Sequence, residues 1–186
     1  MIEFGIFHLG NFFIGLEFVF LSAFVITAAI YDIQLRRIPN WLVLSGIASS
    51  LLWATASGYG YGLIFWAAGL AVGFFSFLPL YIFRAMGAGD VKLMALVGSF
   101  LGGFAAFQTV VLTLLAGGAL ALMVMAFKRS WKLVFSNLSV MMANIAIAAM
   151  CRQLPKTEMP AQSAGNLPYG VAIAAGTLVY VGFFRQ

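Results

Sequence analysis

Runs of about twenty apolar residues limit this chain to folds that a membrane can accommodate, because a transmembrane helix needs roughly 20 such residues in sequence. Two of the runs extend from Asn11 to Tyr31 and from Phe104 to Phe127. Charged residues make up only 8% of the 186 residues, whereas a soluble domain carries roughly 25%. The sequence therefore predicts an all-α polytopic membrane protein, and its length allows about six transmembrane helices.

Glycines, prolines and charged residues separate the runs. Pro39 disfavours a helical conformation at Ile38, and Asn40 is a suitable cap for the helix that follows. We expect Pro79 to kink the third helix and Gly102-Gly103 to end the fourth. The predicted spans cover about 11–31, 41–57, 62–83, 90 to the Gly102 break, 104–127 and 167–184.

The segment from Lys128 to Gly165 is the longest part that does not form an obvious span. At 100° per residue, most of the large apolar side chains in its first half fall on one side of a helix. This pattern predicts an interfacial amphipathic helix between spans five and six, and a further irregular span over Val140 to Cys151 stays open. The first thirty residues lack a basic start and a cleavage site, so we expect the first span to be retained. The sequence predicts one transmembrane domain over 1–186.

Lysine and arginine set the orientation of membrane helices, because they are retained on the cytoplasmic side. With six spans, the connections after spans one, three and five hold nine of the ten basic residues. Both chain ends are therefore predicted to lie outside. Asp32 and Asp90 then both lie on the cytoplasmic side.

These two aspartates are the strongest candidates for a functional site. Asp32 ends the first apolar run, and Asp90 opens the fourth after Gly87-Ala88-Gly89. An ionisable residue in a membrane segment marks a functional site by default. Two neighbouring carboxyl groups can share one proton, which allows one to activate water while the other protonates a peptide carbonyl. The sequence predicts a proteolytic pair.

Helix dipoles suggest how the pair divides its roles. A helix start favours the anion of Asp90, and a helix end disfavours that of Asp32. On this ground we expect Asp90 to act as the base and Asp32 as the acid, although Arg36 and Arg37 oppose the assignment. Simpler alternatives remain: Asp32 and Arg36 have the i,i+4 spacing of a surface ion pair, and Asp90 alone could cap its helix.

Other reactive residues carry less weight. Glu17 precedes Asp32 by fifteen positions, roughly 22 Å along a helix, which is too far to join the pair. His8 and Cys151 have no partners in sequence that would indicate a metal or a thiol nucleophile, so we expect no metal and no cofactor. The basic residues 128, 129 and 132 are expected to contact anionic lipid headgroups, and nothing calls for a nucleic acid.

Two sequence segments carry a family resemblance. Asp32 followed by Arg36-Arg37-Ile38-Pro39-Asn40, and then Gly87-Ala88-Gly89-Asp90-Val91-Lys92, resembles the type IV prepilin peptidase family of GxGD membrane aspartyl proteases. Leu167-Pro168-Tyr169-Gly170 is similar to the proline-glycine motif before the family's last span. The short form resembles the peptidases of tight-adherence (Flp-type) pilus systems.

The resemblance implies an aspartic endopeptidase of the bacterial cytoplasmic (inner) membrane, with Asp32 and Asp90 as catalytic residues. Its partner would be a prepilin or pseudopilin substrate whose short basic leader is cleaved at the cytoplasmic face. The large members also methylate the new amino terminus, but this chain lacks their cysteine-bearing domain, so methylation is not expected. The glycines would let the loop before Asp90 open for an extended substrate. Residues expected to contact substrate are Gly87, Gly89, Lys92, Pro168, Tyr169 and Gly170.

Two further classes of function can be tested against this one. A small ion- or proton-coupled transporter would also place carboxyl groups in the membrane, but nearer its centre and along a polar path. A non-catalytic assembly scaffold would not need either aspartate. The oligomeric state stays open.

Overall fold

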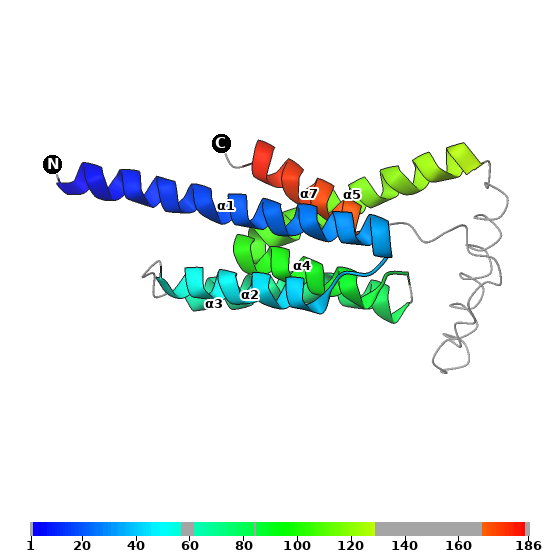
Figure 1. Ribbon diagram of the computed structural model, residues 1–186, viewed down its shortest axis with the longest axis horizontal. Coiled ribbons are helices and arrows are strands. Elements are labelled where there is room, and N and C mark those ends of the chain that lie inside the picture. The colour runs from blue at the N-terminus through cyan, green and yellow to red at the C-terminus, as the bar shows by residue number, and fades with distance from the viewer. Residues whose placement is uncertain (1, 57–61, 84, 129–168, 185–186) are drawn as a thin grey trace. The chain divides into compact units, whose positions relative to one another are not determined.

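The computed structural model describes residues 2–56, 62–83, 85–128 and 169–184. All regular structure in these ranges is helical, which confirms the predicted all-α class (Figure 1). The helices are α1 (Ile2–Leu35), α2 (Asn40–Ala56), α3 (Gly62–Ile82), α4 (Ala88–Leu101), α5 (Gly103–Lys128) and α7 (Tyr169–Phe183). Each predicted span corresponds to one of them, although α1 begins nine residues earlier than expected.

Three of the described helices have the length and composition to cross a membrane: Leu16–Leu35 within α1, Gly62–Ile82 and Gly103–Val124 within α5. Helices α2 and α7 are shorter and also apolar. The chain is thus a polytopic membrane protein, as predicted. Its orientation stays a prediction, and the expected interfacial helix and the alternative span over Val140 to Cys151 lie outside the described residues.

The chain divides into two compact units. One comprises Met1–Gly117 and Pro168–Gln186, and the other comprises Gly118–Leu167. In the second unit the structure describes only the last part of α5. All the contacts described below lie within the first unit, which contains both candidate aspartates.

Helix α4 forms the core of the first unit. It contacts α1, α2, α3 and α7, and Figure 1 shows it between α1 on one side and α2 and α3 on the other. From Val91 to Leu101 every residue except Lys92 is buried. A helix that is apolar all round is expected to be surrounded by protein or lipid, and here protein surrounds it.

Small residues allow α3 to approach α4 until their backbones touch. A methyl group on Gly69 would collide with the carbonyl oxygen of Gly98, and one on Gly98 with that of Gly69. One turn further along α3, a methyl group on Gly73 would collide with the Met94 carbonyl. Such close approach is how membrane helices gain van der Waals contact when lipid removes the hydrophobic driving force.

A buried hydroxyl pair connects three helices within the same unit. The hydroxyls of Ser50 on α2 and Ser99 on α4 are 2.8 Å apart, and the indole Nε1 of Trp66 on α3 donates to Ser50 Oγ at 2.9 Å. A carbonyl in its own helix also lies within hydrogen-bond distance of each serine, so the hydroxyl that does not donate to its neighbour can donate there. Polar groups in apolar surroundings are costly unless bonded, so this network favours one packing of α2, α3 and α4.

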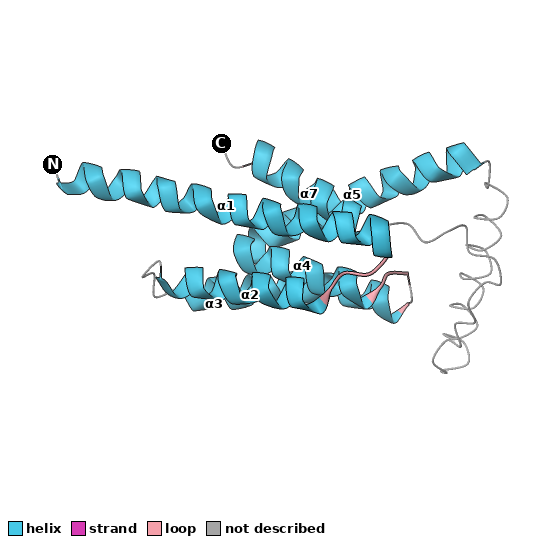
Figure 2. Cartoon of the chain, in the orientation of Figure 1, coloured by secondary structure: helices cyan, strands magenta, loops and turns pink. Residues whose placement is uncertain are grey.

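The two described loops lie at the same end of the first unit (Figure 2). Helix α1 ends where Arg36 adopts a positive φ of 52° and its amide donates to the Asp32 carbonyl at 3.0 Å. This left-handed residue just after a helix is a common C-terminal cap. The loop before α4 ends at Gly87, the N-cap residue. Both aspartates are therefore at this end.

Candidate active site

Asp32 points from the last turns of α1 toward the start of α7. Its side chain is only 8% exposed, and its Oδ2 atom accepts a hydrogen bond from the Gly170 amide at 2.7 Å. Gly170 is the second residue of α7, where backbone N–H groups have no partner within the helix. The Arg36 guanidinium also acts electrostatically on this carboxyl group. Asp32 is thus a buried group with a specific partner, which is more than a surface ion pair provides.

Asp90 occupies the third position of α4. Its Oδ2 atom accepts from the amide of the N-cap residue Gly87 at 3.0 Å, and its own amide donates to the Gly87 carbonyl at 3.1 Å. In a capping box, the side chain at N3 accepts a hydrogen bond from the N-cap amide. Asp90 makes this bond, whereas Gly87 has no side chain to make the return bond. Asp90 therefore contributes to capping from N3, whereas the N-cap position that the alternative gave to Asp90 is occupied by Gly87.

The two carboxyl groups influence each other. Asp90 is also only 8% exposed, and its position in the first turn of α4 lies outside the three candidate spans. The pKa of Asp90 is raised to about 6. Burial is the largest cause of this rise, the Gly87 amide opposes it, and the negative charge of Asp32 adds to it. Like charges in proximity disfavour double ionisation. The structure therefore brings Asp32 and Asp90 within electrostatic reach, and such a pair titrates as a unit.

The loop after α1 and the first residue of α2 pack against the start of α4. A methyl group on Gly89 would lie 3.3 Å from Ile38 Cβ, so the small residue lets Ile38 sit against the turn that leads to Asp90. At the start of α2, Asn40 Oδ1 accepts from Lys92 Nζ at 3.0 Å. These contacts join the two segments that hold the aspartates.

The remaining residues expected to contact substrate lie around the same end. Tyr169 is half-buried, and the charge of Asp90 acts on its hydroxyl group. Gly87 is exposed, and Lys92 is exposed and bonded to Asn40. Pro168 lies outside the described residues. Whether these residues contact substrate stays a prediction.

Sequence reasoning missed two structural relationships. It assigned Gly170 to substrate, whereas the structure makes its amide the hydrogen-bond donor to Asp32. It also did not identify Asn40 as the partner of Lys92. The signal for the first was a glycine directly at the start of a span, where the N–H groups of a helix are unpaired.

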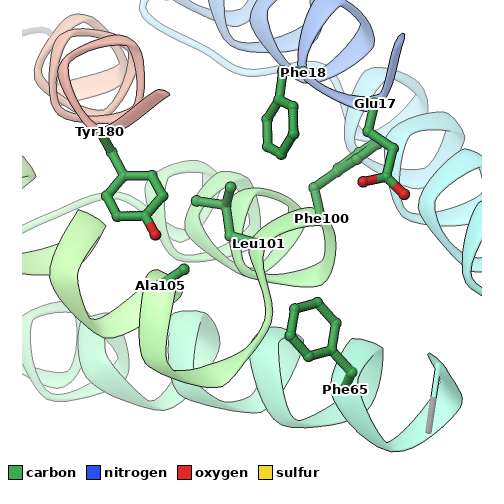
Figure 3. Close-up of a pocket in the computed structure, with 7 residues that line it drawn as sticks. All are labelled: Glu17, Phe18, Phe65, Phe100, Leu101, Ala105 and Tyr180. Atoms are coloured by element: carbon green, nitrogen blue, oxygen red, sulfur yellow. The ribbon is translucent and has the colours of Figure 1, made fainter. Parts of the chain in front are cut away.

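A cavity of about 250 Å³ lies elsewhere in the first unit, and neither aspartate lines it. Figure 3 shows its mostly apolar wall, with the Glu17 carboxylate and the Tyr180 hydroxyl at its margins. Glu17 lies fifteen residues before Asp32, roughly 22 Å along α1, as the sequence predicted. The lining residues are Glu17, Phe18, Phe65, Phe100, Leu101, Ala105 and Tyr180.

In chemical terms the site is a pair of shielded carboxyl groups at the ends of membrane helices, each with one backbone donor. Such a pair is suited to acid–base hydrolysis, because one group can accept a proton while the other donates one. In the part of the chain that the structure describes, no three His, Cys, Asp or Glu side chains gather as a metal site would require.

Comparison with known proteins identifies the family. The sequence model of the type IV leader peptidase family matches residues 19–125, which include both aspartates. The match covers more than half of the chain, and the chain belongs to this family. No curated protein and no solved structure matches it significantly. Gly170 lies beyond the matched residues, so its bond to Asp32 comes from the structure alone.

Proposed function

We propose that the protein is an aspartic endopeptidase that removes the leader peptide from prepilin-like substrates at the cytoplasmic face of a bacterial inner membrane. Membership in the type IV leader peptidase family supports a peptidase. The observation that carries the aspartic mechanism is the pair Asp32 and Asp90, two buried carboxyl groups that interact electrostatically.

The pair would work on a water molecule held between the two carboxyl groups. The ionised carboxylate takes a proton from this water as it attacks the peptide carbonyl carbon, while the protonated carboxyl group gives its proton to the carbonyl oxygen. The tetrahedral gem-diol intermediate then breaks at the C–N bond, and the proton taken from water goes to the leaving amine. One hydroxyl group of the intermediate returns its proton to the carboxylate that had acted as the acid, which releases the new carboxyl terminus and restores the singly protonated pair. Shielding from bulk solvent favours the singly protonated state on which this cycle depends.

The basic leader of the substrate would lie on the cytoplasmic side, where the basic loops of this chain are predicted. Gly87 is exposed beside Asp90, where an extended backbone would approach, and Lys92 and Tyr169 are available at the margin. Ile38 packs against Gly89, so we place Gly89 in this group on the family resemblance. We place Pro168 in the same group on the family resemblance.

Asparagine substitutions at the two aspartates test the proposal. Asn keeps the size of the side chain and can still accept the amide hydrogen bond, but it cannot exchange a proton at neutral pH. We expect Asp32→Asn and Asp90→Asn each to abolish cleavage of a co-expressed prepilin, with both variants inserted in the membrane at normal levels. The measurement is the mobility shift of the substrate on immunoblots.

Glu17→Gln provides the matched control. It neutralises another acidic residue of α1, the helix that carries Asp32, at a position far from the pair. Processing should continue in this variant. Normal processing in either aspartate variant would contradict the peptidase mechanism. Proton-coupled uptake by proteoliposomes that depends on Asp32 would instead support a transporter.

A further inference from the structure

We propose that the backbone amide of Gly170 positions Asp32 and holds it in the ionised state, so that in the singly protonated pair Asp32 is the base and the proton resides on Asp90. This assignment is the reverse of the one expected from the helix dipoles of α1 and α4 alone. This inference rests on the proposed function and deepens it. It assigns to α7, the last described helix, a part in setting the charge of a carboxyl group 138 residues earlier in the chain.

The first argument is the hydrogen bond itself. The Gly170 amide is among the first N–H groups of α7, which together carry the positive end of the helix dipole. It donates to Asp32 Oδ2 at 2.7 Å, a short distance typical of a donor facing a charged acceptor. A bond to the charged form of an acid favours that form. The dipole of α1, which disfavours the anion, is therefore opposed by that of α7.

The second argument is the lack of space. A methyl group on Gly170 would lie 2.8 Å from Asp32 Oδ2, 2.9 Å from Asp32 Cβ and 3.1 Å from Asp32 Cγ. No ordinary side chain fits at these distances without displacing the carboxyl group. Only glycine allows the amide and the carboxylate to meet.

The third argument is that α7 is held in place along its length. Ala172 and Ile173 are buried, and a methyl group on Gly176 would lie 2.7 Å from the Thr113 amide nitrogen on α5. Helix α7 also packs along α1. The amide therefore presents a fixed donor, and preorganised donors stabilise charge without further reorganisation.

The two carboxyl groups differ in their surroundings. Each accepts one backbone amide, but the bond to Asp32 is shorter, and the cation of Arg36 acts on Asp32. The ionisable group that α4 contributes beside Asp32 is Asp90. Helix α7 contributes Tyr169, on which the charge of Asp90 acts, and α2 has no ionisable residue. Lys92 of α4 is bonded to Asn40. Burial acts on both carboxyl groups alike, so the difference between them rests on the amide bond and on Arg36.

The test compares three glycines of α7 in purified full-length protein with a prepilin substrate. The acidic limb of kcat/KM against pH reports the base of the free enzyme. For Gly170→Ala we expect kcat/KM to fall at least about tenfold at neutral pH and the acidic limb to move up by about one pH unit, a tenfold change in the ionisation constant. Gly182→Ala, where nothing lies within 4 Å, should match the wild type.

Gly176→Ala separates positioning from packing, because its methyl group collides with Thr113 and not with Asp32. It should lower thermal stability and leave the acidic limb in place. If Gly170→Ala does not insert, replacing residue 170 by glycolic acid through nonsense suppression removes the N–H group without adding atoms, and the same shift is expected.

An unmoved acidic limb in both Gly170 variants, or an equal shift in Gly176→Ala, would overturn the inference. That result leaves the proposed function intact as long as the wild type cleaves and the two asparagine variants do not. If the wild-type protein itself does not cleave the prepilin substrate, the proposed function is contradicted.

Discussion

The side chains that hold the candidate site together are few, and each is bonded to an atom from a distant part of the sequence. Asp32 meets the Gly170 amide, and Lys92 meets Asn40. Sequence spacing predicted the two aspartates as a pair, because both lie at span ends that were expected on the same side of the membrane. It did not predict the donor to Asp32, since nothing local to Tyr169-Gly170 indicates which helix lies opposite.

Asp90 is expected to lower the stability of the folded protein at neutral pH. Because its pKa rises from the ordinary 3.8 to about 6 in the fold, the folded state binds more protons than the unfolded state between these values. Stability therefore falls as pH increases from about 4 to 6 and stays reduced above. Two pH units correspond to about 3 kcal/mol at most.

Asp90→Asn should remove this cost. We expect the variant to melt at a higher temperature than the wild type at pH 7.5, and the difference to shrink or vanish at pH 4. Thermal unfolding in detergent at the two pH values measures the effect. An Asp90→Asn variant that is equally destabilised at both pH values would contradict it.

Lys92 can be tested for substrate contact by breaking its bond in two ways. Lys92→Met removes the charge and the bond to Asn40, whereas Asn40→Ala removes the bond alone. Lys92 is exposed, so each change should cost less than about 1 kcal/mol of stability. If Lys92 binds substrate, KM rises severalfold in Lys92→Met and stays near the wild-type value in Asn40→Ala. Equal KM values in the two variants would assign Lys92 a structural role only.

At the level of helices, the pairing of α3 with α4 is the closest described contact. The bounds of both helices followed from sequence, including the end of α4 at Gly102, whose φ of 79° favours glycine. Their contact did not, because glycines within apolar runs indicate close packing without naming a partner. Gly69 and Gly98 meet in this contact, and a side chain on either residue would collide with the backbone of the other.

Gly98→Ala should therefore be costly. The added methyl group meets the Gly69 carbonyl, and overpacking of this kind costs about 1–3 kcal/mol. Gly69→Ala should have a similar effect. Gly118→Ala on α5 is the control, since nothing lies within 4 Å of that position. Thermal unfolding of the purified variants gives the comparison, and an unchanged melting temperature for Gly98→Ala would refute the tight contact.

For the whole molecule, composition alone predicted a polytopic helical membrane protein, because so many apolar residues and so few charges fit no soluble fold. The order of the helices was also predictable from the breaks between runs. Which helix forms the centre was not: α4 is the shortest described helix and carries Asp90 and Lys92, yet four other helices contact it. Its central position depends on contacts between distant segments, which periodicity does not encode.

The orientation of the chain is open to a direct test. In a Cys151→Ala background, Arg37→Cys is expected on the cytoplasmic side and Phe104→Cys on the outer side. Both positions are exposed, so a membrane-impermeant maleimide should label position 104 in intact cells and position 37 only in inverted vesicles. The reverse pattern would invert the predicted topology and move both aspartates to the outer face.

The backbone contact between α3 and α4 also limits how a polypeptide could be admitted to the carboxyl groups. We expected the glycine-rich segment before Asp90 to act as a hinge. It joins two helices that touch at Gly69 and Gly98, so these helices have little freedom to part. Gating movements are then left to the loop over 36–39 and to the α1 side of the unit. Ile38, which packs against Gly89 just before Asp90, belongs to the first of these two segments.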